Sequence, residues 1–321
     1  MLDKFKKNNG TNNSIDFNKD EFVTRKEFEK LKKLTETHQQ YLNNLFIFYE
    51  LEPTPFLEGM RELSYELMKF VDNVCVKYDI EFWMDYGTLL GAVRHNDFVP
   101  WDDDLDVGMM RKDYNKLVEV LPVEIKENNL TNLIADFKID KHNNISKRWF
   151  QVSYKHPGIK TKFIGVDFFP YDYIKKQDND LSAEFNNALT EYYHNPTEFT
   201  LEEYLDKFYQ DFNLSLEKQD NIISGVDNLR GNIRQFTLYR TIQFKTEDLF
   251  PLKRLKFGKY ELPAPENPRK YLIDIYGKNY MQIPRKIRDH GRLNKFKKRE
   301  NVMEMLEEGI NMLKKANENY I

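Results

Sequence analysis

The spacing of apolar residues predicts a chain built mainly from helices, with a group of short strands between residues 82 and 169. Apolar side chains that recur every three or four residues mark one face of a helix, whereas short apolar runs bounded by turn residues mark buried strands. The clearest helical pattern covers residues 56–78, with apolar positions at Leu63, Leu67, Phe70, Val71 and Val74. Residues 20–49 suit one or two polar helices, and the Asn- and Lys-rich residues 1–20 are expected to be frayed.

Strands and helices are mixed up to residue 173, and long charged helices dominate after it. Strands are predicted at 82–85, 103–109, 132–139, 149–154 and 162–169. Between them, one short helix is predicted to end at Arg94, and a second helix to cover 112–121. Later helices are predicted at 181–193, 201–208, 220–238, 268–276 and 300–317, with a strand-like piece at 255–261. Gly277 is a stop signal for the helix at 268–276. This order predicts an α/β (α+β) fold in which helices flank a mixed sheet.

The overall charge gives no sign of a nucleic-acid partner, because 49 Lys and Arg residues nearly balance 52 Asp and Glu residues. The single cysteine, Cys75, excludes an intrachain disulfide and suits a buried structural thiol. The first residues lack an apolar run of the secretory type, and no run approaches the ~18 apolar residues of a spanning helix. We therefore expect a soluble protein in the cytoplasm.

Residues 82–108 hold the densest chemistry of the chain, and four aspartates lie near its end. If residues 103–109 form a strand, then Asp102, Asp104 and Asp106 share one face, and Asp103 points to the other. Carboxylates that converge on one face repel each other unless a cation neutralises them. Hard oxygen ligands of this kind suit Mg²⁺ or Mn²⁺. The sequence therefore predicts a divalent metal site.

The aspartates have three other interpretations. A calcium loop needs Gly and Glu where this chain has Val107 and Asp113, so that interpretation fails. A solvated acidic turn does not account for the apolar Leu105 and Val107 between the acids. A glycosyltransferase that clamps its metal with a D-x-D motif stays open on the aspartates alone.

The residues upstream separate these alternatives. Gly87 and Thr88 precede a helix and then a strand with two aspartates, which is the layout of the nucleotidyltransferase fold. That layout expects a third acid on a neighbouring strand, and Asp167 lies alone among apolar residues in F-I-G-V-D-F-F-P. Since an unpaired buried carboxylate is costly, such a residue is seldom there for packing alone. Asp172 is the weaker candidate, because Pro170 is expected to end the strand.

The run Y-G-T-L-L-G-A-V-R-H…F-V-P-W-D-D-D-L-D-V-G resembles the signature of the LicD/fukutin-related family. The later blocks V-D-F-F-P and F-G-K-Y-E-L-P-A-P…Y-L…Y-G…Y-M-Q-I-P resemble that family's downstream motifs, so the resemblance covers roughly residues 80–284. It implies a nucleotidyltransferase-like catalytic core at 56–180. Residues 1–55 would then be an N-terminal helical extension, partly disordered, and residues 181–321 a helical C-terminal region on the acceptor side.

The resemblance also implies an activity: metal-dependent transfer of phosphocholine from CDP-choline to a cell-surface glycan or glycolipid of the teichoic acid or lipopolysaccharide type. The alternative within the family is transfer of phospho-glycerol or phospho-ribitol from its CDP form. A D-x-D glycosyltransferase and an inactive binding module that keeps the fold are further alternatives.

Roles can be assigned to the matching residues. Gly87 and Thr88 are expected to cradle the donor phosphates, and Asp104 and Asp106 to bind Mg²⁺ or Mn²⁺. Asp167 is the third metal ligand or the general base that takes the proton of the acceptor hydroxyl. Asp102 is a supporting partner at the start of the strand.

Less specific signals concern the donor and the membrane. Arg94 could pair with a phosphate, and His95 is either an acid for the leaving nucleotide or an ordinary structural histidine. A choline group suits an aromatic cage, for which the candidates are Trp83, Tyr86, Trp101 and Trp149. The basic residues within 285–299 form a solvated helix face, or they bind an anionic acceptor or the anionic inner leaflet of the membrane.

Overall fold

The computed structural model describes residues 24–45, 55–100, 102–142, 145–159, 162–175, 184, 201–224, 242–282, 296 and 299–320. The chain divides into two compact units, residues 1–52 and 53–321. In the first unit the described element is helix α1 (Arg25–Leu45), which begins with a capping box between Thr24 and Glu27. Its apolar side chains Phe28, Leu31 and Leu34 are at least half exposed.

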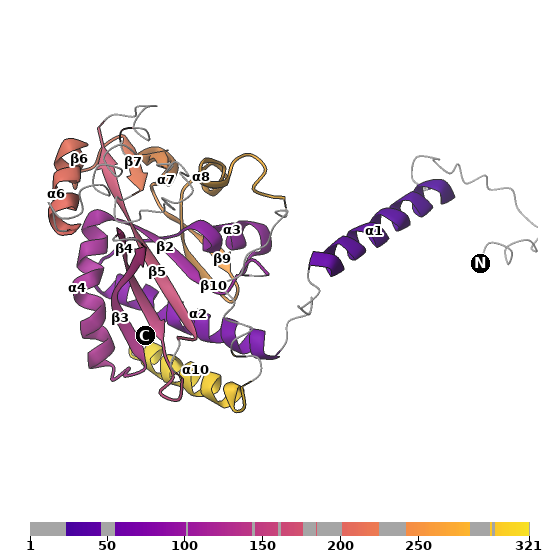
Figure 1. The fold of residues 1–321 in the computed structure, drawn as a ribbon, viewed down its shortest axis with the longest axis horizontal. Helices are drawn as coiled ribbons and strands as arrows, with labels where there is room; N and C mark the ends of the chain where they lie inside the picture. The colour runs from indigo at the N-terminus through magenta and orange to yellow at the C-terminus, as the bar shows by residue number, and fades with distance from the viewer. Residues whose placement is uncertain are drawn as a thin grey trace, which may run out of the picture. The chain divides into compact units, whose positions relative to one another are not determined.

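The second unit contains all the other described elements, which are drawn in Figure 1. Its helices are α2 (Pro55–Lys77), α3 (Tyr86–His95), α4 (Arg111–Glu127), α6 (Leu201–Asp211), α7 (Thr246–Leu249), α8 (Pro268–Tyr276) and α10 (Val302–Glu318). Its strands are β1 (Trp83–Met84), β2 (Leu105–Met110), β3 (Leu133–His142), β4 (Ile145–Tyr154), β5 (Ile164–Ile174), β6 (Leu214–Ser215), β7 (Asn221–Ser224), β8 (Gln243–Lys245), β9 (Lys253–Phe257) and β10 (Tyr260–Ala264). Helices around a mixed sheet confirm the predicted α/β class.

One mixed sheet organises the unit around its longest strand. Its main order is β1-β2-β5-β4-β3, and β6 and β7 pair with β5 further along, with β8 beyond β7. The β2–β5 pair is parallel, and the other pairs are antiparallel. β5 therefore lies between β2 and β4. A separate hairpin consists of β9 and β10.

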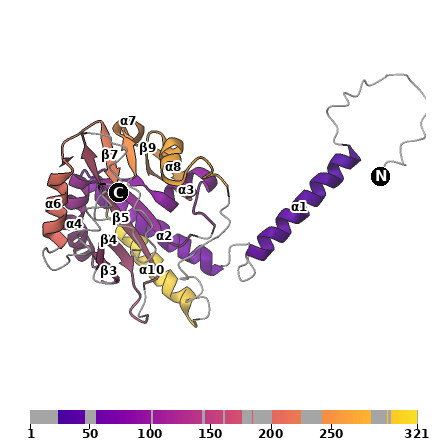
Figure 2. The same ribbon diagram turned by 45° about the horizontal axis from the view of Figure 1, so that its top comes forward.

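The core is formed where α2 packs against the sheet. The predicted apolar positions of α2, including Leu63, Leu67 and Val74, are fully buried. Burying a side chain of this size contributes about 1.5–3 kcal/mol. Helix α10, from the C-terminal end of the chain, lies beside α2 in both views (Figures 1 and 2). Part of the predicted C-terminal region thus completes the core of the sheet.

Two predicted strand boundaries were wrong. Residues 102–104 lie outside the sheet, because the Asp102 N–H bonds to the Val99 carbonyl at 2.9 Å in a turn that contains Pro100. The strand expected to stop at Pro170 continues to Ile174. β5 pairs with β4 up to Phe168 and with β7 from Tyr171, so Pro170 falls in the gap between these ladders, where a proline is tolerated.

The predicted helix at 220–238 was also wrong at its start, because Asn221–Ser224 form strand β7. Ile222 and Ile223 are both fully buried between strand neighbours, and two β-branched residues in a row suit a strand. The rest of that helix, and nearly all of the predicted helix at 181–193 and of the basic segment 285–299, lie outside the described residues. Within the described part of the chain, no helix is both long and apolar enough to cross a membrane.

Candidate active site

A buried carboxylate fixes the start of α3. The Asp85 side chain caps the helix by accepting a hydrogen bond from the Tyr86 N–H at 2.8 Å. It is fully buried and also accepts hydrogen bonds from the hydroxyls of Tyr171 at 2.6 Å and Tyr271 at 3.0 Å. Three donors satisfy this buried group, which would otherwise be costly. Tyr86 is held at a φ of 36°, a rare conformation for a non-glycine residue, at the first position of the helix.

Two glycines, one helical turn apart on α3, leave room for the chain that returns along it. A Cβ atom on Gly87 would lie 2.3 Å from Oδ2 of Asp102, and one on Gly91 would lie 2.4 Å from the Asp97 carbonyl oxygen. Residues four apart share a face of a helix. The chain therefore reverses after α3, passes Gly91 closely, and brings the Asp102 carboxylate against Gly87.

Gly87 and Thr88, in the first turn of α3, also bind the start of β2. The Asp106 N–H donates to the hydroxyl of Thr88 at 2.7 Å, and the Asp106 carboxylate accepts from the Gly87 N–H at 3.3 Å. The Asp106 carbonyl accepts from the Asp85 N–H at 3.0 Å. Gly87, Thr88 and Asp106 were predicted as site residues, and the structure brings these three together.

Three of the aspartates form a cluster with the geometry of a cation site. Oxygen atoms of Asp102, Asp103 and Asp104 all lie within 4.8 Å of one another. Oxygens that share one Mg²⁺ at about 2.1 Å are roughly 3 to 4 Å apart, so these residues fit a divalent ion after small adjustments. Asp103 was predicted to point away, and this was wrong, since residues 102–104 form a loop in which strand alternation does not apply.

Asp167 lies next to Asp106 in the sheet. The two residues are paired in the parallel β2–β5 register, so their side chains share a face. Asp106 is the one partly exposed residue of β2, and Asp167 is one of two in β5. On its other side Asp167 pairs with Gln151 of β4, whose amide nitrogen donates to Oδ1 of Asp167. Sequence reasoning missed Gln151, although the alternation of polar Gln151 and Ser153 in β4 marks this face.

The remaining predicted residues lie elsewhere. Arg94 and His95 are in the last turn of α3, about 11 Å along the helix from Gly87. Partial desolvation and the neighbouring Arg94 charge lower the pKa of His95. Asp172 is fully buried and makes a two-pronged ion pair with Arg111, at 2.8 Å for both contacts, so it is a structural residue.

The aromatic residues predicted as candidates for a choline cage differ in burial. Trp83 is fully buried, donates to the Tyr271 hydroxyl at 2.9 Å, and packs against Gly108, so it belongs to the core. Tyr86 is buried against Phe169. Trp149 is partly buried, and Trp101 lies outside the described residues.

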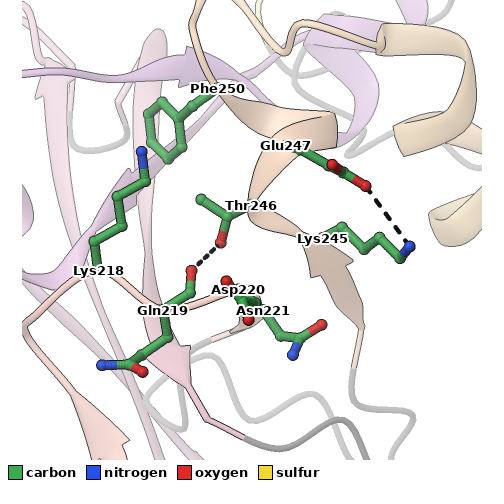
Figure 3. A pocket seen from close by; sticks show the side chains of 8 residues that line it. All are labelled: Lys218, Gln219, Asp220, Asn221, Lys245, Thr246, Glu247 and Phe250. Carbon is green, nitrogen blue, oxygen red and sulfur yellow. Dashed lines mark hydrogen bonds and ion pairs between the residues drawn. The ribbon is translucent and has the colours of Figure 1, made fainter.

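A hollow of about 670 Å³ lies between the β6–β7 connection and the start of α7 (Figure 3). It is lined by Lys218, Gln219, Asp220, Asn221, Lys245, Thr246, Glu247 and Phe250. Lys245 and Glu247 form an ion pair at 3.6 Å, and charges of both signs line the walls. None of the predicted site residues contributes to it, so this hollow is separate from the aspartate cluster.

The segment that holds this geometry is similar to known proteins. Residues 79–205 match the family described as LicD/FKTN/FKRP, nucleotidyltransferase domain. The chain is 46% identical over 67 residues to an uncharacterized protein of Rickettsia prowazekii, covering 21% of this chain and 25% of that protein. It is 43% identical over 54 residues to the lipopolysaccharide cholinephosphotransferase LicD of Haemophilus influenzae, covering 17% and 20%. It is 37% identical over 67 residues to the human ribitol 5-phosphate transferase FKRP, covering 20% and 13%. The matched segments thus span a quarter or less of these relatives.

Proposed function

We propose that this chain is a metal-dependent phosphotransferase, because residues 79–205 match the nucleotidyltransferase domain of the LicD/FKTN/FKRP family. It moves phosphocholine from CDP-choline to a hydroxyl group of a cell-surface glycan of the lipopolysaccharide or teichoic acid type. One observation carries the proposal: Asp106 bonds to the first turn of α3 and pairs with Asp167 in the sheet, and Asp102 of the Asp102–Asp104 cluster lies against the same turn. Acids around a helix N-terminus suit a metal that binds a diphosphate.

Each part of this site would do one task in the transfer. A divalent ion, when bound by the aspartates, supplies positive charge that stabilises the leaving nucleotide. The positive end of the α3 dipole favours the negative phosphates, and Gly87 allows a close approach. The acceptor oxygen forms a bond to phosphorus, the bond to the bridging oxygen breaks, and CMP leaves. Asp167 takes the proton of the acceptor hydroxyl or serves as a further metal ligand.

The similarity to the ribitol 5-phosphate transferase FKRP supports a second candidate, transfer of an alditol phosphate from its CDP form. Both reactions use the same acids and release CMP. They differ in the transferred group, so the pocket beyond the phosphates decides between them.

CMP release tests the proposal directly. The full chain is incubated with CDP-choline, CDP-ribitol or CDP-glycerol and a glycan acceptor, in Mg²⁺, Mn²⁺ or excess EDTA. We expect release with one donor and its loss in EDTA. Asp106→Asn should lower the rate by more than about 100-fold, because it removes a charge that holds the ion. Asp79→Asn, at an exposed acid in the turn after α2, is the matched control.

Other outcomes identify the alternatives. An equal rate in EDTA would exclude the metal-dependent reaction. Release of UDP or GDP from a nucleotide sugar would support a glycosyltransferase. Tight Mn²⁺ binding without turnover of any donor would support a binding module that keeps the fold.

We also propose a cytoplasmic location, with the basic residues in 285–299 holding the enzyme near an anionic membrane surface that carries the acceptor. Each Lys or Arg near such a surface adds about 1 kcal/mol. Retention on vesicles of anionic lipid at low salt, and release at high salt, would support this. Equal retention on neutral vesicles would contradict it.

A further inference from the structure

Four polar side chains form a row across the face of the sheet that carries the site. The strand registers pair Asp136 of β3 with Gln151 of β4, Gln151 with Asp167 of β5, and Asp167 with Asp106 of β2. Paired residues share a face, with Cβ atoms about 4.5–5.5 Å apart. Gln151 is the only residue of this row that is uncharged, and it stands directly behind Asp167 as seen from Asp106.

The Gln151 side chain has a fixed orientation. Its Nε2 donates to Oδ1 of Asp167, and its Oε1 accepts from Nζ of Lys162. An ammonium group can only donate and a carboxylate can only accept, so these two partners permit one orientation of the amide. The side chain is 5% exposed, which shields both contacts from water.

A glycine makes room for this arrangement. A Cβ atom on Gly165 would lie 3.2 Å from Nε2 of Gln151 and 3.1 Å from the Val152 carbonyl oxygen, closer than ordinary contact. Gly165 lies two residues before Asp167 on the same face of β5. The strand that carries the acid therefore also leaves space for the amide that binds it.

We propose that Gln151, held by Lys162, is a positioning residue that fixes the Asp167 carboxylate beside Asp106. This inference rests on the proposed function and adds a residue pair to its site. With one carboxylate oxygen bound by the amide, the plane of the Asp167 carboxylate is set before a metal or an acceptor hydroxyl arrives. Such second-layer hydrogen bonds commonly change metal affinity or activity by about 10–100-fold.

The test compares four variants of the full chain. Gln151→Met keeps the volume and removes both hydrogen bonds, and Lys162→Met removes the partner behind the amide. The double variant completes a cycle that shows whether Lys162 acts through Gln151. Ser153→Ala is the matched control, since Ser153 is a buried polar residue on the same face of the same strand, two positions away.

Two measurements are made on each variant: Mn²⁺ affinity by electron paramagnetic resonance, and kcat and KM for CMP release. We expect Gln151→Met to weaken Mn²⁺ binding or lower kcat by at least about 10-fold, with little change in the donor KM. Lys162→Met should lose less, and the double variant should match Gln151→Met. Ser153→Ala should stay within threefold of the unchanged chain.

Three results would overturn the inference. In the first, Gln151→Met keeps both Mn²⁺ affinity and kcat within threefold. In the second, the losses of Mn²⁺ affinity and kcat in Gln151→Met are fully accounted for by the fraction of unfolded protein seen in thermal melts, as expected for a purely structural residue. In the third, the unchanged chain binds no Mn²⁺. Additive losses in the double variant would overturn the part assigned to Lys162. Failure of the proposed function is seen separately, as an absence of CMP release by the unchanged chain, while the Mn²⁺ titration still tests Gln151.

Discussion

Replacing each of the two glycines of α3 by alanine should have opposite consequences. The added methyl group at Gly87 meets the tip of a side chain, Oδ2 of Asp102 at 2.3 Å. At Gly91 it meets backbone, the Asp97 carbonyl oxygen at 2.4 Å and the Val99 nitrogen at 2.9 Å. A carboxylate tip can rotate away, whereas two backbone groups move only with their loop. We therefore expect Gly87→Ala to lower activity and Gly91→Ala to lower stability.

The structure gives the size of each effect. Ordinary contact requires the Asp102 oxygen to retreat by about 1 Å, and a displacement of this size can lower a rate by about 100-fold. The stability of Gly87→Ala should change little, because the better helix propensity of alanine, worth up to about 1 kcal/mol, offsets the cost of moving the Asp102 side chain. At Gly91, overpacking costs about 1–3 kcal/mol and exceeds this gain. A net loss near 1–2 kcal/mol should lower Tm by several degrees.

CMP release and thermal melting on the same preparations would check both expectations. Each variant is the control for the other, since both add one methyl group to the same face of the same helix. Full activity in Gly87→Ala would refute the position of Asp102 against α3. An unchanged Tm in Gly91→Ala would refute the close passage of the returning loop.

Three further predictions concern buried and partly buried polar groups. Tyr271→Phe leaves Asp85 one donor short and should cost about 1–3 kcal/mol in urea unfolding, and no change would contradict the hydrogen bond. Arg111→Met leaves Asp172 charged and buried, so it should lower the free energy of unfolding by about 3–5 kcal/mol. The double variant Arg111→Met/Asp172→Asn should recover part of this loss. Equal stability of the single and the double variant would argue against the ion pair. Burial raises the pKa of Asp113 above its ordinary 3.8, so the folded state binds this proton more tightly, and stability falls as pH rises through the raised value. Asp113→Asn should therefore raise Tm at pH 7, with a gain that fades as pH falls toward 3.8, and an equal gain at both pH values would contradict this.

Local signals predicted the elements whose ends are set by their own residues. The helix predicted at 268–276 has these bounds in the structure, because Pro268 suits the first turn and Gly277, at a φ of 85°, ends it. The α/β class followed from the order of strands and helices. In contrast, the continuation of β5 through Pro170 depends on β7, which lies about 50 residues later and supplies the next ladder.

The site was predictable where its residues are close in sequence. Gly87, Thr88 and Asp106 meet because one short helix and one loop separate them. Strand alternation failed at Asp103, since a turn at Pro100 keeps residues 102–104 out of the sheet. Gln151 could not be assigned, because its role depends on the pairing register of β4 with β5, and no local pattern fixes which strands pair.

The downstream sequence blocks around residues 257–276 hold helix α3 in place, because residues from them bond to both of its ends. Tyr271 of α8 donates to Asp85 at the start of the helix, 186 residues away in sequence. At the other end, the N–H of Gly258 in the β9–β10 turn donates to the Asn96 carbonyl at 2.7 Å. Gly258 has a φ of 56°, and a Cβ atom there would lie 2.3 Å from the Tyr65 ring, so only glycine fits this turn. A chain without β9, β10 and α8 would lose both contacts, and the first turn of α3 would no longer be fixed against Asp106. The position of Asp106 thus depends on residues that lie more than 150 positions later in the sequence.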